Sequence, residues 1–178
     1  MNLKRASEVG AVGHAVRRAM YRTLSLDRYL KTLSGMYLLG YRTGIGRSAA
    51  YEYPRFLKNL VSEGDTAIDI GANLGYYSYV LAGLAGPSGK VYAVEPVRPI
   101  LNVLRRNLRK YRNVEILNYA LGDAEKTIRM GNSSVGENGY FGTGQNFVMD
   151  RPTDGLPVVE FEAEMRRGSV LFADLPKI

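Results

Sequence analysis

Two carboxylates and two glycines at the ends of two successive apolar runs form the chemically most informative part of the sequence. Asp69 lies in the apolar run 67–70, and Gly71 and Gly75 follow it directly, before a helical pattern begins. A glycine turn between a strand and a helix can hold a ligand, because backbone N–H groups come close and the helix start carries partial positive charge. Glu95 ends the next apolar run, 24 residues after Gly71. An acidic residue at about this spacing holds ribose hydroxyls in nucleotide sites.

The glycine spacing argues against ligands that present a pyrophosphate. A nicotinamide fingerprint needs glycines at offsets 0, 2 and 5, and from Gly71 these offsets hold Gly71, Asn73 and Tyr76. The Gly-Lys-Ser/Thr sequence of a phosphate-binding loop is also absent from the turn. A ligand without phosphate groups therefore suits the turn better.

S-adenosylmethionine meets the demands of these residues. It has no phosphate and carries a sulfonium cation, its amino-acid end needs close backbone approach and nearby acceptors, and its ribose needs a carboxylate. Asp69, the open backbone at Gly71 and Gly75, and Glu95 match those needs. Hydrogen bonds from ribose hydroxyls to Glu95 would be charge-assisted and worth roughly 1.5–3 kcal/mol.

The surrounding pattern predicts a parallel α/β sheet that positions these residues. The predicted strands are 67–70, 90–94 and 114–120, and the predicted helices are 52–61, 76–84 and 99–112. Strands that alternate with helices through short connections indicate a right-handed, doubly wound parallel sheet. We expect the strand order 3-2-1, with helices 76–84 and 99–112 on one face and helix 52–61 on the other.

Composition excludes several classes of chemistry. The chain of 178 residues suits one domain with a real core. It contains no cysteine, and its single histidine, His14, lies near the N-terminus. Thiolate nucleophiles, Cys-ligated metals and His clusters are thereby excluded, and no metal is expected. No apolar run approaches 18 residues and no signal-peptide pattern is seen, so we expect a cytoplasmic protein without a transmembrane segment.

Positive charge is concentrated in the N-terminal part of the chain. The net charge is +7, and residues 1–58 hold 11 Lys/Arg against 3 Asp/Glu. We divide the chain into a basic helical segment, 1–50, and a cofactor-binding domain, 51–178. The basic segment could meet RNA or anionic lipid, but we favour its interpretation as a solvated helical face. Arginines late in helix 99–112 complement the helix dipole, which we favour over a nucleic-acid patch.

The last third of the chain has a weaker pattern. Residues 131–157 hold six glycines and two prolines, too irregular for a helix and suited to a lid or a loop. Residues 157–163 alternate apolar and acidic side chains like a half-exposed strand.

Residues 52–123 resemble the class I S-adenosylmethionine-dependent methyltransferases, and within them the FkbM-type family. The resemblance rests on the sequences DIGANLGYYS, VYAVEP and NYALGD. It implies a site for the cofactor. The methionine and ribose portions would be surrounded by Asp69, Gly71, Asn73 and Gly75. Glu95 would bind the ribose, and Tyr119 and Ala120 would lie near the adenine. Asn107, late in the second helix, also matches the family, and we interpret it as a packing or capping residue.

The chain departs from the family at its C-terminal end. Such proteins place a fourth strand beside the central one, ending in a Lys-x-Asp-x-Glu-Gly signature, whereas this sequence ends at Ile178, where that strand should begin. We therefore expect a partial fold that lacks the acceptor-side strands, and we assign no catalytic residue. The uncovered strand edge should be protected by 157–163, by 170–178, by the basic segment or by a second copy of the chain, so self-association is expected.

Two functions follow from these observations. The first is an S-adenosylmethionine-dependent methyltransferase that acts on the hydroxyl of a small metabolite or glycan, and that would be inactive or partner-dependent as a fragment. The second is a non-catalytic nucleoside-binding module whose basic segment meets RNA or anionic lipid. Nucleic acid is the less favoured partner.

Overall fold

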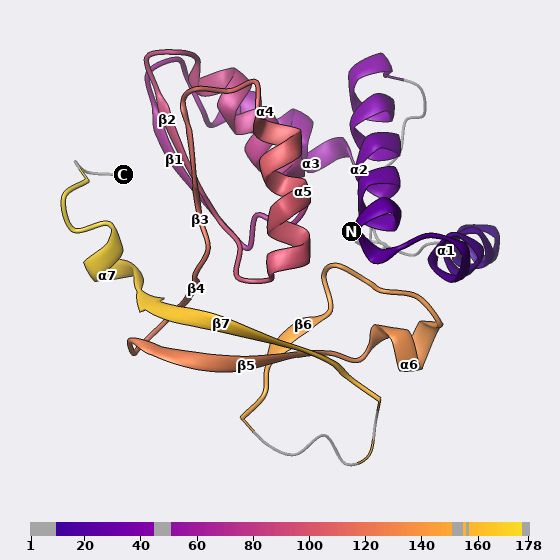
Figure 1. Ribbon diagram of the computed structural model, residues 1–178. Coiled ribbons are helices and arrows are strands. Elements are labelled where there is room, and N and C mark those ends of the chain that lie inside the picture. Colours follow the sequence, from indigo (N-terminus) through magenta and orange to yellow (C-terminus); the bar gives the residue numbers. More distant parts are fainter. Residues whose placement is uncertain (1–9, 45–50, 151–154, 156, 176–178) are drawn as a thin grey trace, which may run out of the picture.

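The computed structural model describes residues 10–44, 51–150, 155 and 157–175, and they form a three-stranded and a four-stranded sheet with helices beside them (Figure 1). The helices are α1 (Ala11–Thr23), α2 (Leu26–Thr43), α3 (Glu52–Phe56), the 3-10 helix η2 (Leu57–Asn59), α4 (Tyr76–Ala85), α5 (Arg98–Leu108), α6 (Ser134–Asn138) and α7 (Gly168–Leu171). The strands are β1 (Thr66–Ile70), β2 (Lys90–Val94), β3 (Val114–Leu117), β4 (Ala120–Gly122), β5 (Lys126–Asn132), β6 (Asn146–Val148) and β7 (Val159–Arg167).

The first sheet is parallel with the order β1-β2-β3, as the sequence predicts. The described residues form a fold of the α/β class. The third strand ends at Leu117 and not at Ala120. Beyond Leu117 the Asn118 side chain takes the place of backbone pairing with the neighbouring segment, because its Nδ2 donates to the carbonyls of Glu95 and Pro96, both at 2.9 Å. Ala120 already belongs to β4, in the second sheet.

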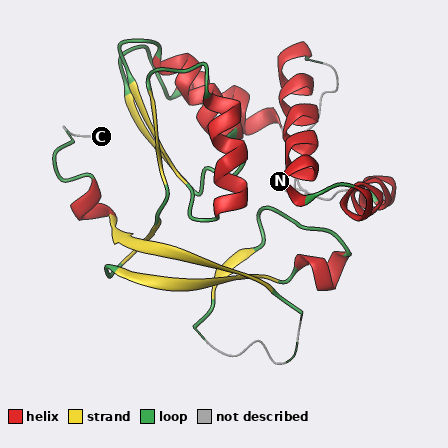
Figure 2. Cartoon of the chain, in the orientation of Figure 1, coloured by secondary structure: helices red, strands yellow, loops and turns green. Residues whose placement is uncertain are grey.

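Helices α4 and α5 cover one face of this sheet (Figure 2). The prediction that helix 52–61 lies on the opposite face is wrong, since α3 and η2 pack against α4. Leu57 and Val61 contact the buried cluster that includes Leu81 and Ala82 of α4. Leu57 and Val61 are therefore partly buried on the same side of the sheet as α4, whereas Phe56 and Leu60 are exposed.

The second sheet has the order β4-β7-β5-β6 and was not predicted from sequence. β7 pairs antiparallel with the full length of β5, and cross-strand contacts such as Arg129–Glu160 at 2.6 Å lie on its exposed face. Residues 157–163 therefore do not cover β1, which corrects that expectation. Within the described residues β1 pairs with β2 alone, so self-association through its free edge stays a prediction.

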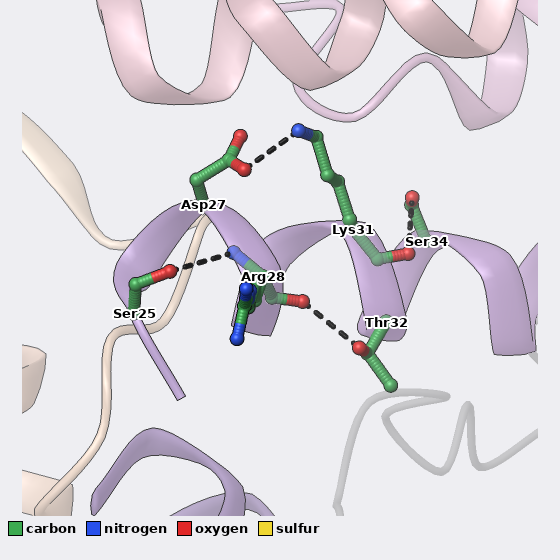
Figure 3. Close-up of polar contacts among 6 residues, drawn as sticks. All are labelled: Ser25, Asp27, Arg28, Lys31, Thr32 and Ser34. Atoms are coloured by element: carbon green, nitrogen blue, oxygen red, sulfur yellow. Dashed lines mark hydrogen bonds and ion pairs between the residues drawn. The ribbon is translucent and has the colours of Figure 1, made fainter. Parts of the chain in front are cut away.

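Helix α2 is built by strong local signals and packs into the main core. Ser25 caps it by accepting a hydrogen bond from the Arg28 backbone N–H, and Asp27 and Lys31 form an i,i+4 ion pair at 2.6 Å (Figure 3). Its residues Tyr29 and Leu30 are fully buried in the largest apolar cluster. In the described part of the chain, no helix is long and apolar enough to cross a membrane.

Candidate functional site

The turn that follows β1 uses its own backbone N–H groups internally. The N–H groups of Gly71 and Ala72 both donate to the Val94 carbonyl, at 3.0 and 2.9 Å, and that of Gly75 donates to the Ala72 carbonyl at 2.8 Å. The Asn73 N–H donates to Glu95 Oε2 at 2.9 Å, and the Leu74 N–H to the Asn73 side chain at 2.8 Å. The turn therefore presents few free N–H donors to a ligand, and the groups it presents are mainly hydrogen-bond acceptors. A phosphate-binding loop has the opposite character.

The two glycines of the turn serve different purposes. Both have positive φ, +75° at Gly71 and +86° at Gly75, which L side chains adopt at a cost. A Cβ added at Gly71 meets nothing within 4 Å, so this backbone borders open space. A Cβ at Gly75 would lie 2.6 Å from Leu104 Cδ1. Gly71 leaves room for a ligand, whereas Gly75 allows α4 to pack closely on α5.

Glu95 is a buried carboxylate at the carboxyl end of β2. Its side chain is 4% exposed, and its oxygens accept from the backbone N–H groups of Asn73 and Val97, both at 2.9 Å. Burial raises the pKa of Glu95, the two backbone hydrogen bonds oppose this, and the charge of Asp69 raises it further. Each carboxylate oxygen has a second lone pair that can accept from a ligand hydroxyl.

Asp69 is the second acid at this edge, and it is half-buried. Its Oδ2 accepts a hydrogen bond from the Ser78 hydroxyl at 2.5 Å. Burial raises the pKa of Asp69, against the lowering effect of Ser78. None of the ion pairs among the described residues includes Asp69 or Glu95. A buried acid and a half-buried acid without a cationic partner favour a cationic ligand between or beside them.

The raised pKa of Asp69 makes a prediction for stability. Because the folded state binds the proton more tightly than the unfolded state, the contribution of Asp69 to stability is full below its unfolded pKa and is lost as the pH rises through its folded pKa. Thermal melting should therefore show Asp69→Asn gaining stability relative to the wild type as pH rises through this range. The exposed Asp123→Asn is the control. The prediction would be contradicted if the stability of Asp69→Asn minus that of the wild type fell as the pH rises.

The two residues predicted near the adenine, Tyr119 and Ala120, lie where the chain passes from β3 to β4. Ala120 is buried in the main apolar cluster, where it packs with the second sheet. Tyr119 is half-buried between β3 and β4, and the guanidinium of Arg166 lies 5.5 Å from the centroid of its ring. Asn107 donates to the Leu74 carbonyl at 2.7 Å, which confirms its interpretation as a packing residue.

A loop of the second sheet reaches the turn and was missed by sequence reasoning. The carbonyl of Thr143 accepts hydrogen bonds from the side chains of Asn73, at 3.1 Å, and Asn146, at 2.8 Å. The buried Asn132 fixes the same loop by donating to the Gly142 carbonyl and to Asn146. The sequence shows asparagines scattered among glycines in this segment, but this pattern does not indicate which asparagine side chains are buried. This loop holds Asn73, at φ +53°, in its left-handed conformation.

Comparisons with known proteins find similarity to methyltransferases. Residues 69–153 match the family model described as the methyltransferase FkbM domain. The chain is 43% identical over 63 residues to a protein-L-isoaspartate O-methyltransferase of Methanothrix thermoacetophila, covering 34% of this chain and 29% of that protein. It is 30% identical over 113 residues to a probable cobalt-precorrin-6B C(15)-methyltransferase of Sulfolobus acidocaldarius, covering 62% and 53%. The matches thus span well under two thirds of either relative.

A solved structure also matches a short part of the chain. A SAM-dependent O-methyltransferase from Thermotoga maritima is 33% identical, with a TM-score of 0.36, over 38% of this chain and 27% of that one.

Proposed function

We propose that this chain, a class I S-adenosylmethionine-dependent methyltransferase of the FkbM type, binds its cofactor at the carboxyl edge of β1 and β2 and serves methyl transfer to an oxygen acceptor. One observation carries the proposal. The N–H donors of the turn are satisfied internally, while the buried Glu95 and the half-buried Asp69 beside it have no cationic partner among the described residues. Such a site fits a cationic cofactor better than a pyrophosphate.

The residues present fit S-adenosylmethionine. The open space at Gly71 admits the ligand against the backbone, and Glu95 has free lone pairs for ribose hydroxyls. Asp69 provides negative charge for the cationic methionine end, and Tyr119 is the adenine-side candidate. We assign Gly75 and Ala120 to packing. When bound, the cofactor supplies an electrophilic methyl group on its sulfonium.

The acceptor in this proposal is a hydroxyl of a small metabolite or glycan. The two curated relatives named above are, by their names, an isoaspartate O-methyltransferase and a precorrin C-methyltransferase, so relatives do not narrow the acceptor. No carboxylate is assigned as a base, and the contribution of the protein would be to hold both reactants in an oriented, water-poor site. A cytoplasmic location and the division near residue 50 stay predictions.

Calorimetric titration with S-adenosylmethionine tests the proposed cofactor site. We expect saturable one-to-one binding and displacement by S-adenosylhomocysteine, because both share the ribose and the amino-acid end. ATP should not displace the bound cofactor, because the turn has no free cluster of N–H groups for its phosphates. Absence of binding, or displacement by ATP, would contradict the assignment.

A methyl-transfer assay distinguishes an enzyme from a non-catalytic binding module. Methyl transfer from labelled cofactor into hydroxyl-bearing acceptors would support the enzyme, and cofactor binding without transfer to any acceptor class would support the non-catalytic alternative.

A further inference from the structure

A cavity of about 280 Å³ lies at the junction of α2, α4 and α5, and its polar lining is mostly cationic. The polar side chains that line it are Arg42, Tyr79, Arg106, Asn107, Arg109 and Lys110. None of the cofactor-site residues proposed above lines it. The function proposed for the carboxyl edge of the sheet does not account for this cavity.

The four cations of this cavity lack carboxylate partners. No ion pair among the described residues includes any of them. Arg106 is in the last turn of α5, and Arg109 and Lys110 lie in the turn that follows it, so three like charges repel one another over a short stretch of chain. The cluster therefore carries an electrostatic cost that an anion would remove.

Helix dipoles explain only part of this charge. Arg42 is in the last turn of α2 and Arg106 in the last turn of α5, where cations are favoured. Each helix end carries about half a negative charge, so two ends offset roughly one of the four positive charges. A surplus of about three remains around one cavity.

The positive potential of the cavity affects the pKa of Tyr79. Lys110 Nζ donates to the Tyr79 hydroxyl at 2.9 Å and lies 4.5 and 4.6 Å from the ring centroids of Tyr79 and Tyr111. Burial raises the pKa of Tyr79, but the hydrogen bond from Lys110 and the charges of Lys110 and Arg42 outweigh it, and the net pKa is lowered. The two rings also hold the ammonium in place, so the site is partly preorganised.

We propose that this cavity binds a phosphate or diphosphate group. Arginine guanidinium groups match phosphate oxygens in a bidentate geometry, and lysine adds a point charge. A volume of about 280 Å³ equals that of about nine water molecules, which is enough for a diphosphate. The group could belong to a small phosphorylated molecule or to the backbone of a single-stranded nucleic acid.

Titration with inorganic diphosphate tests the site, with two matched double variants. Arg106→Gln with Arg109→Gln removes two cations that line the cavity. Arg105→Gln with Arg112→Gln removes two cations from the same region, the last turn of α5 and the turn after it, that do not line the cavity. We expect wild type and the second variant to bind alike, and the first to bind about tenfold or more weakly. Thermal melting of both variants checks the fold.

A competition experiment distinguishes the two sources of phosphate. If a single-stranded RNA oligonucleotide displaces diphosphate from the wild type, the site serves a polymer backbone. If the RNA fails to displace diphosphate, the site serves a small phosphorylated molecule. Absence of saturable diphosphate binding, or an equal loss in both double variants, would overturn the proposal, because general electrostatic attraction would then suffice.

Discussion

Replacing Glu95 with glutamine is expected to weaken S-adenosylmethionine binding by roughly ten- to a hundredfold. Glu95 is buried, and its charge is the natural partner for ribose hydroxyls and for the cationic cofactor. Charge-assisted hydrogen bonds of this kind are worth about 1.5–3 kcal/mol, and each 1.4 kcal/mol is a factor of ten. Calorimetric titration of the purified variant measures the effect.

The same substitution has a second, separable effect on stability. Both Glu95 oxygens accept backbone N–H groups, from Asn73 and Val97. A glutamine amide would turn its NH₂ toward one of these donors, which leaves a buried N–H without an acceptor and costs about 1–3 kcal/mol. We therefore expect a lower melting temperature together with the lost affinity.

Glu115→Gln is the control for Glu95→Gln. Glu115 is an exposed carboxylate on the neighbouring β3 and pairs with Lys90 at 3.0 Å. Its replacement should leave cofactor affinity unchanged, because surface ion pairs contribute little. Wild-type affinity in a folded Glu95→Gln protein would place the cofactor elsewhere.

The sequence predicted the first sheet well because its signals are local. The alternation of apolar strands and amphipathic helices defines β1, β2, α4 and α5 to within a few residues, and short connections specify parallel order. Asp69 and Glu95 could be found because each ends an apolar strand, and parallel strands bring such ends together.

The second sheet could not be predicted in the same way. β5 pairs with β7 across a glycine-rich segment, and nothing local specifies a register between strands so far apart in sequence. The hydrogen bonds within the turn were equally invisible, because they depend on how close Val94 and Glu95 come to Gly71 and Asn73. Sequence therefore suggested N–H groups facing a ligand where the structure uses them internally.

Alanine at Gly71 and at Gly75 should produce opposite patterns of loss. At Gly71 the added Cβ meets nothing in the protein, so the stability cost is about 1–2 kcal/mol from the left-handed backbone. The Cβ projects into the space assigned to the cofactor, so affinity should fall by about tenfold or more, from an overpacking cost of about 1–3 kcal/mol. Titration and chemical denaturation of the one variant measure both.

At Gly75 the loss should be mainly of stability. The added Cβ would lie 2.6 Å from Leu104 Cδ1, and Leu104 is fully buried, so it cannot swing into solvent. Backbone strain of about 1–2 kcal/mol and overpacking of about 1–3 kcal/mol together predict a loss of about 2–5 kcal/mol. Cofactor affinity of the folded fraction should change less than in Gly71→Ala, because this contact faces α5 and not the open space.

A double variant isolates the contact between α4 and α5. Leu104→Ala alone should cost about 2–5 kcal/mol through the cavity it leaves. Combined with Gly75→Ala it makes room for the new Cβ, so the double variant should be more stable than the sum of the single losses by about 0.5–3 kcal/mol. Strict additivity would show that Leu104 does not confine Gly75. A Gly75→Ala protein of wild-type stability that fails to bind the cofactor would reverse the roles assigned to the two glycines.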